Sequence, residues 1–199
     1  MFTLACAVFP ELLRHRLRGI AELSHSQVEA LEAHYTLLLR WNRVLNLTSI
    51  REISLVVERH YCESIFLATH LPSQRLRIAD VGSGAGFPGL PVAIYRPDCH
   101  VTLVESHQRK AVFLKEAVRS LPNVNVLACR AQDVSGEFDC ALSRAVSYRE
   151  LASSLKGLAR AVDLLTGAEK PPSDMGFEWE NPISLPWGNQ RYLVVGKRN

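Results

Sequence analysis

Residues 78–89 read IADVGSGAGFPG and carry the strongest structural signal in the chain. The apolar residues at the start predict a strand, and Pro88 pre-sets the backbone for the first turn of a helix. Gly82, Gly84 and Gly86 lie between the two. Glycine is required where a Cβ would collide with a ligand or would forbid the necessary dihedral angles. The segment therefore predicts a tight turn whose backbone closely approaches a bound molecule.

The sequence around and after this turn alternates between short apolar runs and helical patterns. Such alternation is typical of a mainly parallel sheet with right-handed crossovers, so the expected fold class is α/β. The runs predict strands at 76–81, 101–105, 124–129 and 138–142, and the helical patterns lie at 89–95 and 108–120.

The carboxyl-terminal part predicts a different kind of connection. Two short runs at 183–185 and 191–195 flank the turn-forming residues 186–189, PWGN. This pattern indicates an antiparallel β-hairpin that closes the sheet. Residues 167–182 are rich in glycine, proline and acidic residues, and we expect them to form a loop or a poorly ordered segment.

The amino-terminal part has a helical pattern throughout. Ser26 and Glu29 match a capping box, and apolar residues then recur at helical spacing. A second helical stretch runs from residue 53 to residue 71 and ends before a proline. We therefore predict a helical extension over residues 1–72 that packs on an α/β domain over residues 73–199.

Composition excludes several classes of protein. Hydrophobic residues make up 47% of the chain and charged residues 22%, and a net charge of +3 does not by itself indicate a nucleic-acid binder. The five cysteines are far apart and lack a Cys-x-x-Cys pair, so we expect reduced thiols and no metal site. No apolar run reaches the roughly 18 residues of a membrane span. We expect a soluble, cytoplasmic protein that does not bind membranes.

The glycine segment allows two interpretations. Gly84, Gly86 and Gly89 match the spacing of a dinucleotide fingerprint, with Glu105 at the distance expected for an acid that grips a ribose. The pattern from Asp80 through the alternate glycines also resembles the first motif of S-adenosylmethionine-dependent methyltransferases. The short remainder of the chain and its closing hairpin fit the methyltransferase sheet better than a dehydrogenase with two nucleotide-binding halves.

Further candidate residues follow the other predicted strands. Glu105 ends the second strand, where its carboxylate can accept hydrogen bonds from both ribose hydroxyls. Ala131 and Gln132 follow the third strand and are placed to bracket an adenine. Arg144 ends the fourth strand, at the edge where ligands of such sheets bind, and can meet a carboxylate or a phosphate. The sequence shows no nucleophile or general-base constellation, so no catalytic residue is assigned.

Longer segments resemble a known family, the bacterial 16S ribosomal RNA (guanine-N7) methyltransferases, also called the glucose-inhibited division protein B family. The resemblance rests on the motifs at residues 41–48 (WNRVLNLT), 59–64 (RHYCES), 80–91 (DVGSGAGFPGLP) and 143–145 (SRA). It departs from the family at Glu63, where aspartate is usual. The segment 157–182 also diverges, so the resemblance leaves its role open.

The resemblance implies a Rossmann-like class I methyltransferase domain that uses S-adenosyl-L-methionine. It also implies a reaction at N7 of a guanine in the decoding-region loop of small-subunit ribosomal RNA, presented as RNA or as a ribosomal particle, and we expect a monomer. The implied and motif-based cofactor contacts are Gly82, Gly84, Gly86, Phe87, Glu105, Ala131, Gln132 and Arg144. Trp41 has two interpretations, because its ring can stack on a base or anchor the helical core.

Overall fold

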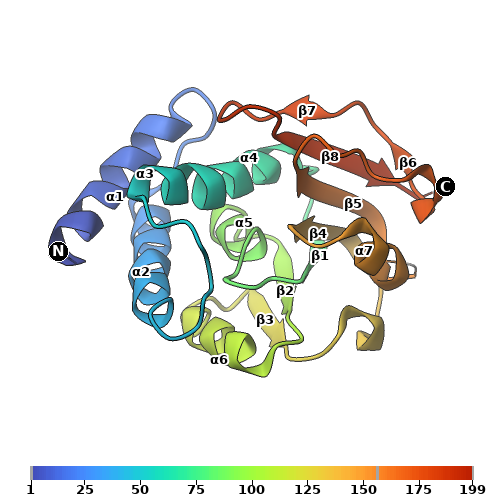
Figure 1. The fold of residues 1–199 in the computed structure, drawn as a ribbon, viewed down its shortest axis with the longest axis horizontal. Helices are drawn as coiled ribbons and strands as arrows, with labels where there is room; N and C mark the ends of the chain where they lie inside the picture. Colours follow the sequence, from blue (N-terminus) through green and yellow to red (C-terminus); the bar gives the residue numbers. More distant parts are fainter. Residues whose placement is uncertain (1, 156, 199) are drawn as a thin grey trace.

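The computed structural model describes residues 2–155 and 157–198. The described residues form one eight-stranded sheet, most of it in the order β3-β2-β1-β4-β5-β8-β6, with β7 paired to β8 (Figure 1). Strands β1 to β5 are parallel, whereas β8 runs antiparallel to β5. The strands are β1 Arg77–Val81, β2 His100–Val104, β3 Val124–Leu127, β4 Phe138–Arg144, β5 Ala159–Thr166, β6 Glu178–Trp179, β7 Ile183–Ser184 and β8 Tyr192–Lys197.

Helices precede the sheet and connect most of its parallel strands. In the described part of the chain, β3 is joined to β4 by only a short 3-10 helix, η2. A six-residue π-helical segment, η1, joins two helices of the amino-terminal part. The helical elements are α1 Phe2–Leu17, α2 His25–Trp41, α3 Ile53–Val56, η1 Val57–Cys62, α4 Glu63–His70, α5 Gly89–Tyr95, α6 Gln108–Ala117, η2 Ala131–Asp133, α7 Tyr148–Leu155 and η3 Ser173–Met175.

The sheet separates two hydrophobic clusters, because successive side chains of a strand point to opposite faces. In β1, Ile78 belongs to the larger cluster, which also contains buried residues of α1, α2 and α4 to α6. Ala79, the next residue, belongs to the smaller cluster, which holds Leu151 and Leu155 of α7. The amino-terminal helices thus contribute to the same core as β1 and β2, while α7 covers part of the other face.

The predicted strands and the closing hairpin are confirmed. Each of the first four strands lies within two residues of its expected ends, and β7 pairs antiparallel with β8 through Ile183 and Leu193. The helices expected at 89–95 and 108–120 are α5 and α6, although α6 ends three residues early. These elements bring the carboxyl ends of β1, β2 and β4 to one edge of the sheet.

Two predictions about local structure were wrong. The capping residue of α2 is Ser24 rather than Ser26: its hydroxyl accepts from the amide of Gln27, and the Gln27 side chain accepts from the Ser24 amide. Residues 167–182 are not a loop throughout, because they contain η3 and strand β6, which pairs with β8. The composition of this segment predicts little regular structure, but Met175 and Phe177 are buried in the smaller cluster and hold it against the sheet.

The sequence pattern also missed β5 and α7. Strand β5 carries Arg160 and Asp163 among its apolar residues, which hides the periodicity of a buried strand. Asp163 is nevertheless only 4% exposed, and burial raises its pKa to about 7. Because a protonated carboxyl is cheaper to bury than an ionised one, the strand tolerates this acid in the sheet.

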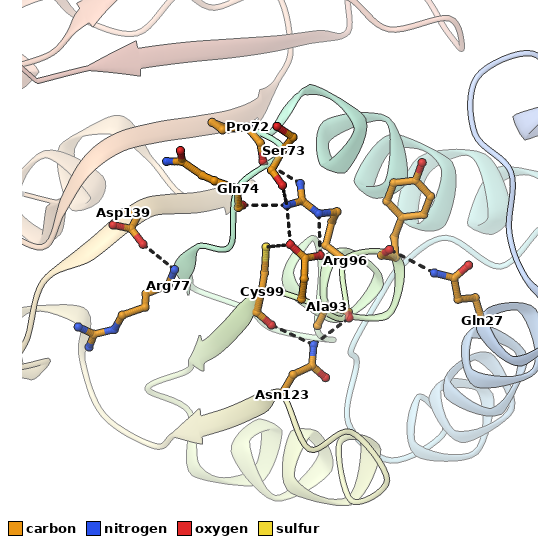
Figure 2. Close-up of polar contacts among 12 residues, drawn as sticks. Gln27, Pro72, Ser73, Gln74, Arg77, Ala93, Arg96, Cys99, Asn123 and Asp139 are labelled. Atoms are coloured by element: carbon orange, nitrogen blue, oxygen red, sulfur yellow. Dashed lines mark hydrogen bonds and ion pairs between the residues drawn. The ribbon is translucent and has the colours of Figure 1, made fainter.

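The connection between α4 and β1 is anchored by Arg96. The Arg96 guanidinium donates to the carbonyl oxygens of Pro72, Ser73 and Gln74, and also pairs with Asp98 (Figure 2). Three carbonyl contacts fix this segment against the end of α5. The division at residue 72 between a helical extension and an α/β domain stays a prediction, but the link at that point is anchored rather than free.

Polar side chains also join the helices to the sheet at its amino-terminal edge. Gln27 of α2 donates to the carbonyl oxygens of Ile94 and Tyr95, and Asn123 donates to those of Ala93 and Cys99 (Figure 2). The two amides satisfy three carbonyl oxygens left open at the end of α5 and one directly before β2. These contacts fix the orientation of α5, whose other end follows the glycine turn.

Candidate cofactor site

The glycine turn lies directly after β1, as the sequence predicts. Gly82, Gly84 and Gly86 have φ values of 74°, 56° and 89°, which L side chains rarely adopt. The amide of Gly82 donates to Val104 at the end of β2, and that of Gly86 donates to Ser83. A Cβ on Gly84 would meet no protein atom closer than 3.8 Å. The conformation therefore requires glycine, while the space beside Gly84 is open to another molecule.

Asp80 lies beneath this turn and is completely buried. Its Oδ2 accepts from the amide of Gly89 at 3.0 Å, whereas Oδ1 has no hydrogen-bond partner among the described residues. Burial raises the pKa of Asp80 to about 7. A buried oxygen without a partner is costly, and the raised pKa lowers this cost because the neutral carboxyl is cheaper to bury than the charged one.

Glu105 is brought to the same turn from the end of β2. Its Oε2 accepts from the amide of Gly84 at 2.8 Å, and its Oε1 accepts from the amide of His107 at 2.7 Å. The side chain is only 7% exposed. Two backbone amides thus fix the carboxylate, and each oxygen retains a lone pair for a further donor. The predicted diol-binding acid and the glycine turn are therefore one structural unit.

Phe87 connects the turn to the amino-terminal helices. Its buried ring stacks on His60 with centroids 4.7 Å apart and meets His34 edge-on at 5.2 Å. The Arg144 guanidinium lies 5.2 Å from the centre of the same ring. Phe87 and Arg144, both predicted as cofactor contacts, are therefore neighbours at the carboxyl edge of the sheet.

His34 supports the turn from α2. Its Nε2 lies 3.0 Å from the carbonyl oxygen of Ala85, which can only accept, so Nε2 carries the proton. Nδ1 then accepts from the hydroxyl of Tyr61 at 2.9 Å. Burial lowers the pKa of His34 to about 4, so the ring is neutral at physiological pH. A residue of the helical extension thus fixes one carbonyl of the glycine turn.

The remaining predicted residues lie on η2. Ala131 packs against the smaller hydrophobic cluster, and Gln132 is exposed. The side-chain amide of Gln132 donates to the hydroxyl of Ser153 of α7 at 3.3 Å. The described contacts of η2 therefore lead to α7, and no contact found among the described residues joins Ala131 or Gln132 to the glycine turn.

A cavity of 660 Å³ adjoins this site at the carboxyl ends of β4 and β5. Only Arg144 among the predicted cofactor contacts lines it. The sequence predicts no role for the other polar residues that line this cavity, although two of them belong to the RHYCES motif at residues 59–64. These residues include Arg59, His60, Tyr148, Thr166 and Arg191.

Trp41 lies outside the cavity. Its indole donates to Glu116 at 2.9 Å and its ring meets Phe113 of α6 edge-on at 6.0 Å. These contacts favour the interpretation of Trp41 as an anchor between α2 and α6. Asn42 of the same motif accepts from the amide of Thr48, so the WNRVLNLT segment closes on itself.

The fold and the turn define the class of protein. A parallel sheet followed by an antiparallel strand differs from the all-parallel dinucleotide-binding sheet, so the structure favours the methyltransferase interpretation of the glycines. A solved S-adenosylmethionine-dependent methyltransferase from Aquifex aeolicus matches 71% of this chain and 92% of its own with a TM-score of 0.57 at 15% identity. The chain therefore has the Rossmann-like fold of S-adenosylmethionine-dependent methyltransferases.

Sequence comparison is more specific. The model of the GidB family, rRNA small subunit methyltransferase G, matches residues 27–164, and the chain belongs to this family. A protein named ribosomal RNA small subunit methyltransferase G from Xylella fastidiosa is 44% identical over 150 residues, which is 74% of this chain and 63% of the relative. The protein of that name from Chromobacterium violaceum is 42% identical, over 68% of this chain and 65% of the relative. The chain thus spans just under two thirds of these relatives.

Proposed function

We propose that the chain transfers a methyl group from S-adenosyl-L-methionine to N7 of a guanine in the decoding-region loop of 16S ribosomal RNA. The observation that carries this proposal is the glycine turn, which holds a fixed, buried carboxylate at Glu105 beside an open space at Gly84. Membership of the family and the names of its relatives supply the substrate. The bound cofactor supplies the activated methyl group.

We propose that eight residues bind the cofactor. Gly82, Gly84 and Gly86 let its amino-acid part approach the backbone, and Glu105 accepts from the two ribose hydroxyls. Phe87 and Arg144 border the turn, where the guanidinium meets a negative group. Ala131 and Gln132 bracket the adenine.

The residues fit a reaction that needs no general base. Guanine N7 has an available lone pair, so no proton must leave before methyl transfer. Catalysis then rests on alignment of the base with the methyl donor and on exclusion of water. Burial lowers the pKa of His60 to about 3, so this ring at the cavity is neutral and does not repel an approaching sulfonium.

We also propose a monomer that works in the cytoplasm, where ribosomal RNA is modified. Its first 72 residues form a helical extension on the methyltransferase domain of residues 73–199, and the contact between His34 and Ala85 supports that arrangement. Among the residues described, none of the helices combines the length and apolarity that crossing a bilayer requires.

The decisive experiment maps N7-methylguanine in 16S ribosomal RNA from cells with and without the protein. A modified site that disappears on deletion and returns on complementation supports the proposal. Calorimetry with S-adenosylhomocysteine and with NAD tests the cofactor separately. Binding of NAD alone would instead support the dinucleotide interpretation of the glycine turn.

A further inference from the structure

Glu63 is a completely buried acid whose partners reach into the cavity. It begins α4, and its side chain is 0% exposed. Arg191 donates to it in a bidentate manner, Nη2 to Oε2 at 2.6 Å and Nε to Oε1 at 3.1 Å. Arg59 lies one helical turn earlier, with Nη1 3.6 Å from Oε1. A buried carboxylate fixes the geometry of the cations that neutralise it.

The arginines themselves are not buried. The side chains of Arg59 and Arg191 are 29% and 24% exposed, and both residues line the 660 Å³ cavity. A Cβ on Gly188, in the hairpin turn, would lie 2.8 Å from Nη2 of Arg59, so the turn packs directly on this guanidinium. Glu63 and the hairpin therefore hold the guanidinium groups in place at the cavity wall.

The wall of the cavity is positively charged. Arg144 adds a third guanidinium, whose pKa burial lowers to about 10, so this group stays charged at neutral pH. Glu63 offsets one of these charges, and His60 is neutral. Glu169 also lines the cavity and is exposed. The site therefore favours an anion.

The position of the cavity indicates which anion it takes. Neither Glu105 nor any residue of the glycine turn from Gly82 to Phe87 lines it, so the cavity lies beside most of the proposed cofactor contacts. The cavity adjoins that turn through Arg144. Planar guanidinium groups held in a fixed orientation suit phosphate recognition, and a base that reacts must leave its stack and be positioned.

We propose that Glu63 is a positioning residue that holds Arg59 and Arg191, and that these two arginines bind a phosphodiester of the RNA beside the base to be methylated. This inference rests on the proposed function and names how the same site takes its substrate. Because the buried carboxylate of Glu63 binds both guanidinium groups, it holds them in one orientation toward the cavity.

The first test removes each arginine charge. Arg59→Gln and Arg191→Gln are expected to weaken binding of a labelled 16S decoding-region RNA fragment by about tenfold, in the range for charge-assisted hydrogen bonds. Arg160→Gln is the matched control, because it removes the same charge from an exposed pair with Glu137 at the opposite end of β5. Affinity for S-adenosylhomocysteine should change by less than about twofold in all three variants.

The second test separates positioning from general electrostatic attraction. Glu63→Gln makes the protein more positive by one charge, so attraction alone would strengthen RNA binding. Loss of positioning should instead lower kcat/KM for methylation of small-subunit particles by about tenfold, because the arginines no longer share a fixed carboxylate. Glu63→Asp keeps the charge and should restore most of the loss. Melting curves and cofactor titrations confirm that each variant is folded.

Several results would overturn the inference. They are tighter RNA binding with unchanged kcat/KM in Glu63→Gln, losses in the arginine variants no larger than in Arg160→Gln, or loss of S-adenosylhomocysteine affinity, which would assign the arginines to the carboxylate of the cofactor. Failure of the proposed function is a distinct result, namely wild-type protein that methylates no particle. The RNA-binding comparison then still decides whether the cavity takes a phosphodiester.

Discussion

At the scale of single residues, the carboxylate of Glu105 has a structural role in the glycine turn and a proposed role in binding the cofactor. It accepts from the amides of Gly84 and His107, and we propose that it also accepts from the ribose hydroxyls. Glu105→Ala should weaken binding of S-adenosylhomocysteine by about 1.5–3 kcal/mol, the range for hydrogen bonds to a charged group. Titration calorimetry at one pH and salt concentration measures the change. Glu137→Ala, at an exposed acid, is the control, and a loss confined to RNA binding would contradict the role of Glu105.

Gly84 and Gly89 should respond differently to the same substitution. A Cβ on Gly84 has space within the protein, so Gly84→Ala should cost about 1 kcal/mol of backbone strain and leave the chain folded, but it should greatly weaken cofactor binding. A Cβ on Gly89 would lie 2.6 Å from Asp80 Cβ, so Gly89→Ala should destabilise the fold itself. Melting temperature and cofactor titration distinguish the two effects. Normal cofactor affinity in folded Gly84→Ala would remove the turn from the site.

At the scale of elements, α2 and η1 support the turn through neutral histidine. The folded pKa of His34 is lowered to about 4, below its unfolded value, so its contribution to stability is present above about pH 6.5 and is lost as the pH falls toward 4. The loss should be of order 1–2 kcal/mol between pH 7 and pH 5.

The variant His34→Gln isolates this contribution. It is expected to be less stable than wild type at pH 7, and the difference in unfolding free energy should shrink as the pH falls, because glutamine does not titrate. Buried Asp80 and Asp163 have raised pKa values and give the opposite trend, so only the difference between the two proteins is informative. Urea unfolding at several pH values measures it, and a constant difference would contradict a neutral, buried His34.

Whether the sequence predicts a helix or strand depends on how clearly its apolar pattern and its end signals appear in the local sequence. The glycine turn follows β1 directly and marks its end, although β1 contains the buried Asp80, and β2 is rich in β-branched residues, so the sequence locates both strands. Strand β5 carries Arg160 and Asp163 and has no comparable turn signal at its end, so the pattern missed it. The capping box of α2 was misplaced by two residues because Ser24, Ser26, Gln27 and Glu29 offer two matching pairs, and only the tertiary contact of Gln27 with α5 selects one.

The candidate site shows the same limit. Local sequence identifies the glycines and Glu105, since both follow strands of the sheet. The cluster of Glu63, Arg59 and Arg191 includes two residues that are 128 positions apart in the sequence, so no local sequence pattern predicts the contact between them. An acid among apolar residues at the start of α4 was the one available signal, because a buried charge needs a partner.

At the scale of the whole molecule, several basic residues lie at the carboxyl edge of the sheet. Helices α6 and α7 both begin at the carboxyl ends of strands, so Arg109, Lys110 and Arg149 lie in their first turns at that edge. The arginines of the amino-terminal segment lie instead at the end of α1, where Arg16 pairs with Glu58 at 3.7 Å. We call the first set the rim group and Arg14, Arg16 and Arg18 the N-terminal group.

Neutralising the rim group should impair methyl transfer more than neutralising the N-terminal group. Both changes remove three charges, but only the rim cations can bind phosphates close enough to align the base with the methyl donor. RNA affinity of wild type should fall as salt rises, with each lost contact lowering the slope of log affinity against log salt by roughly 0.7, while cofactor affinity changes little. Methylation of small-subunit particles at several salt concentrations tests both statements. Full activity of the rim variant with the wild-type salt slope would mean that RNA docks on another face, because removing true phosphate contacts must reduce both.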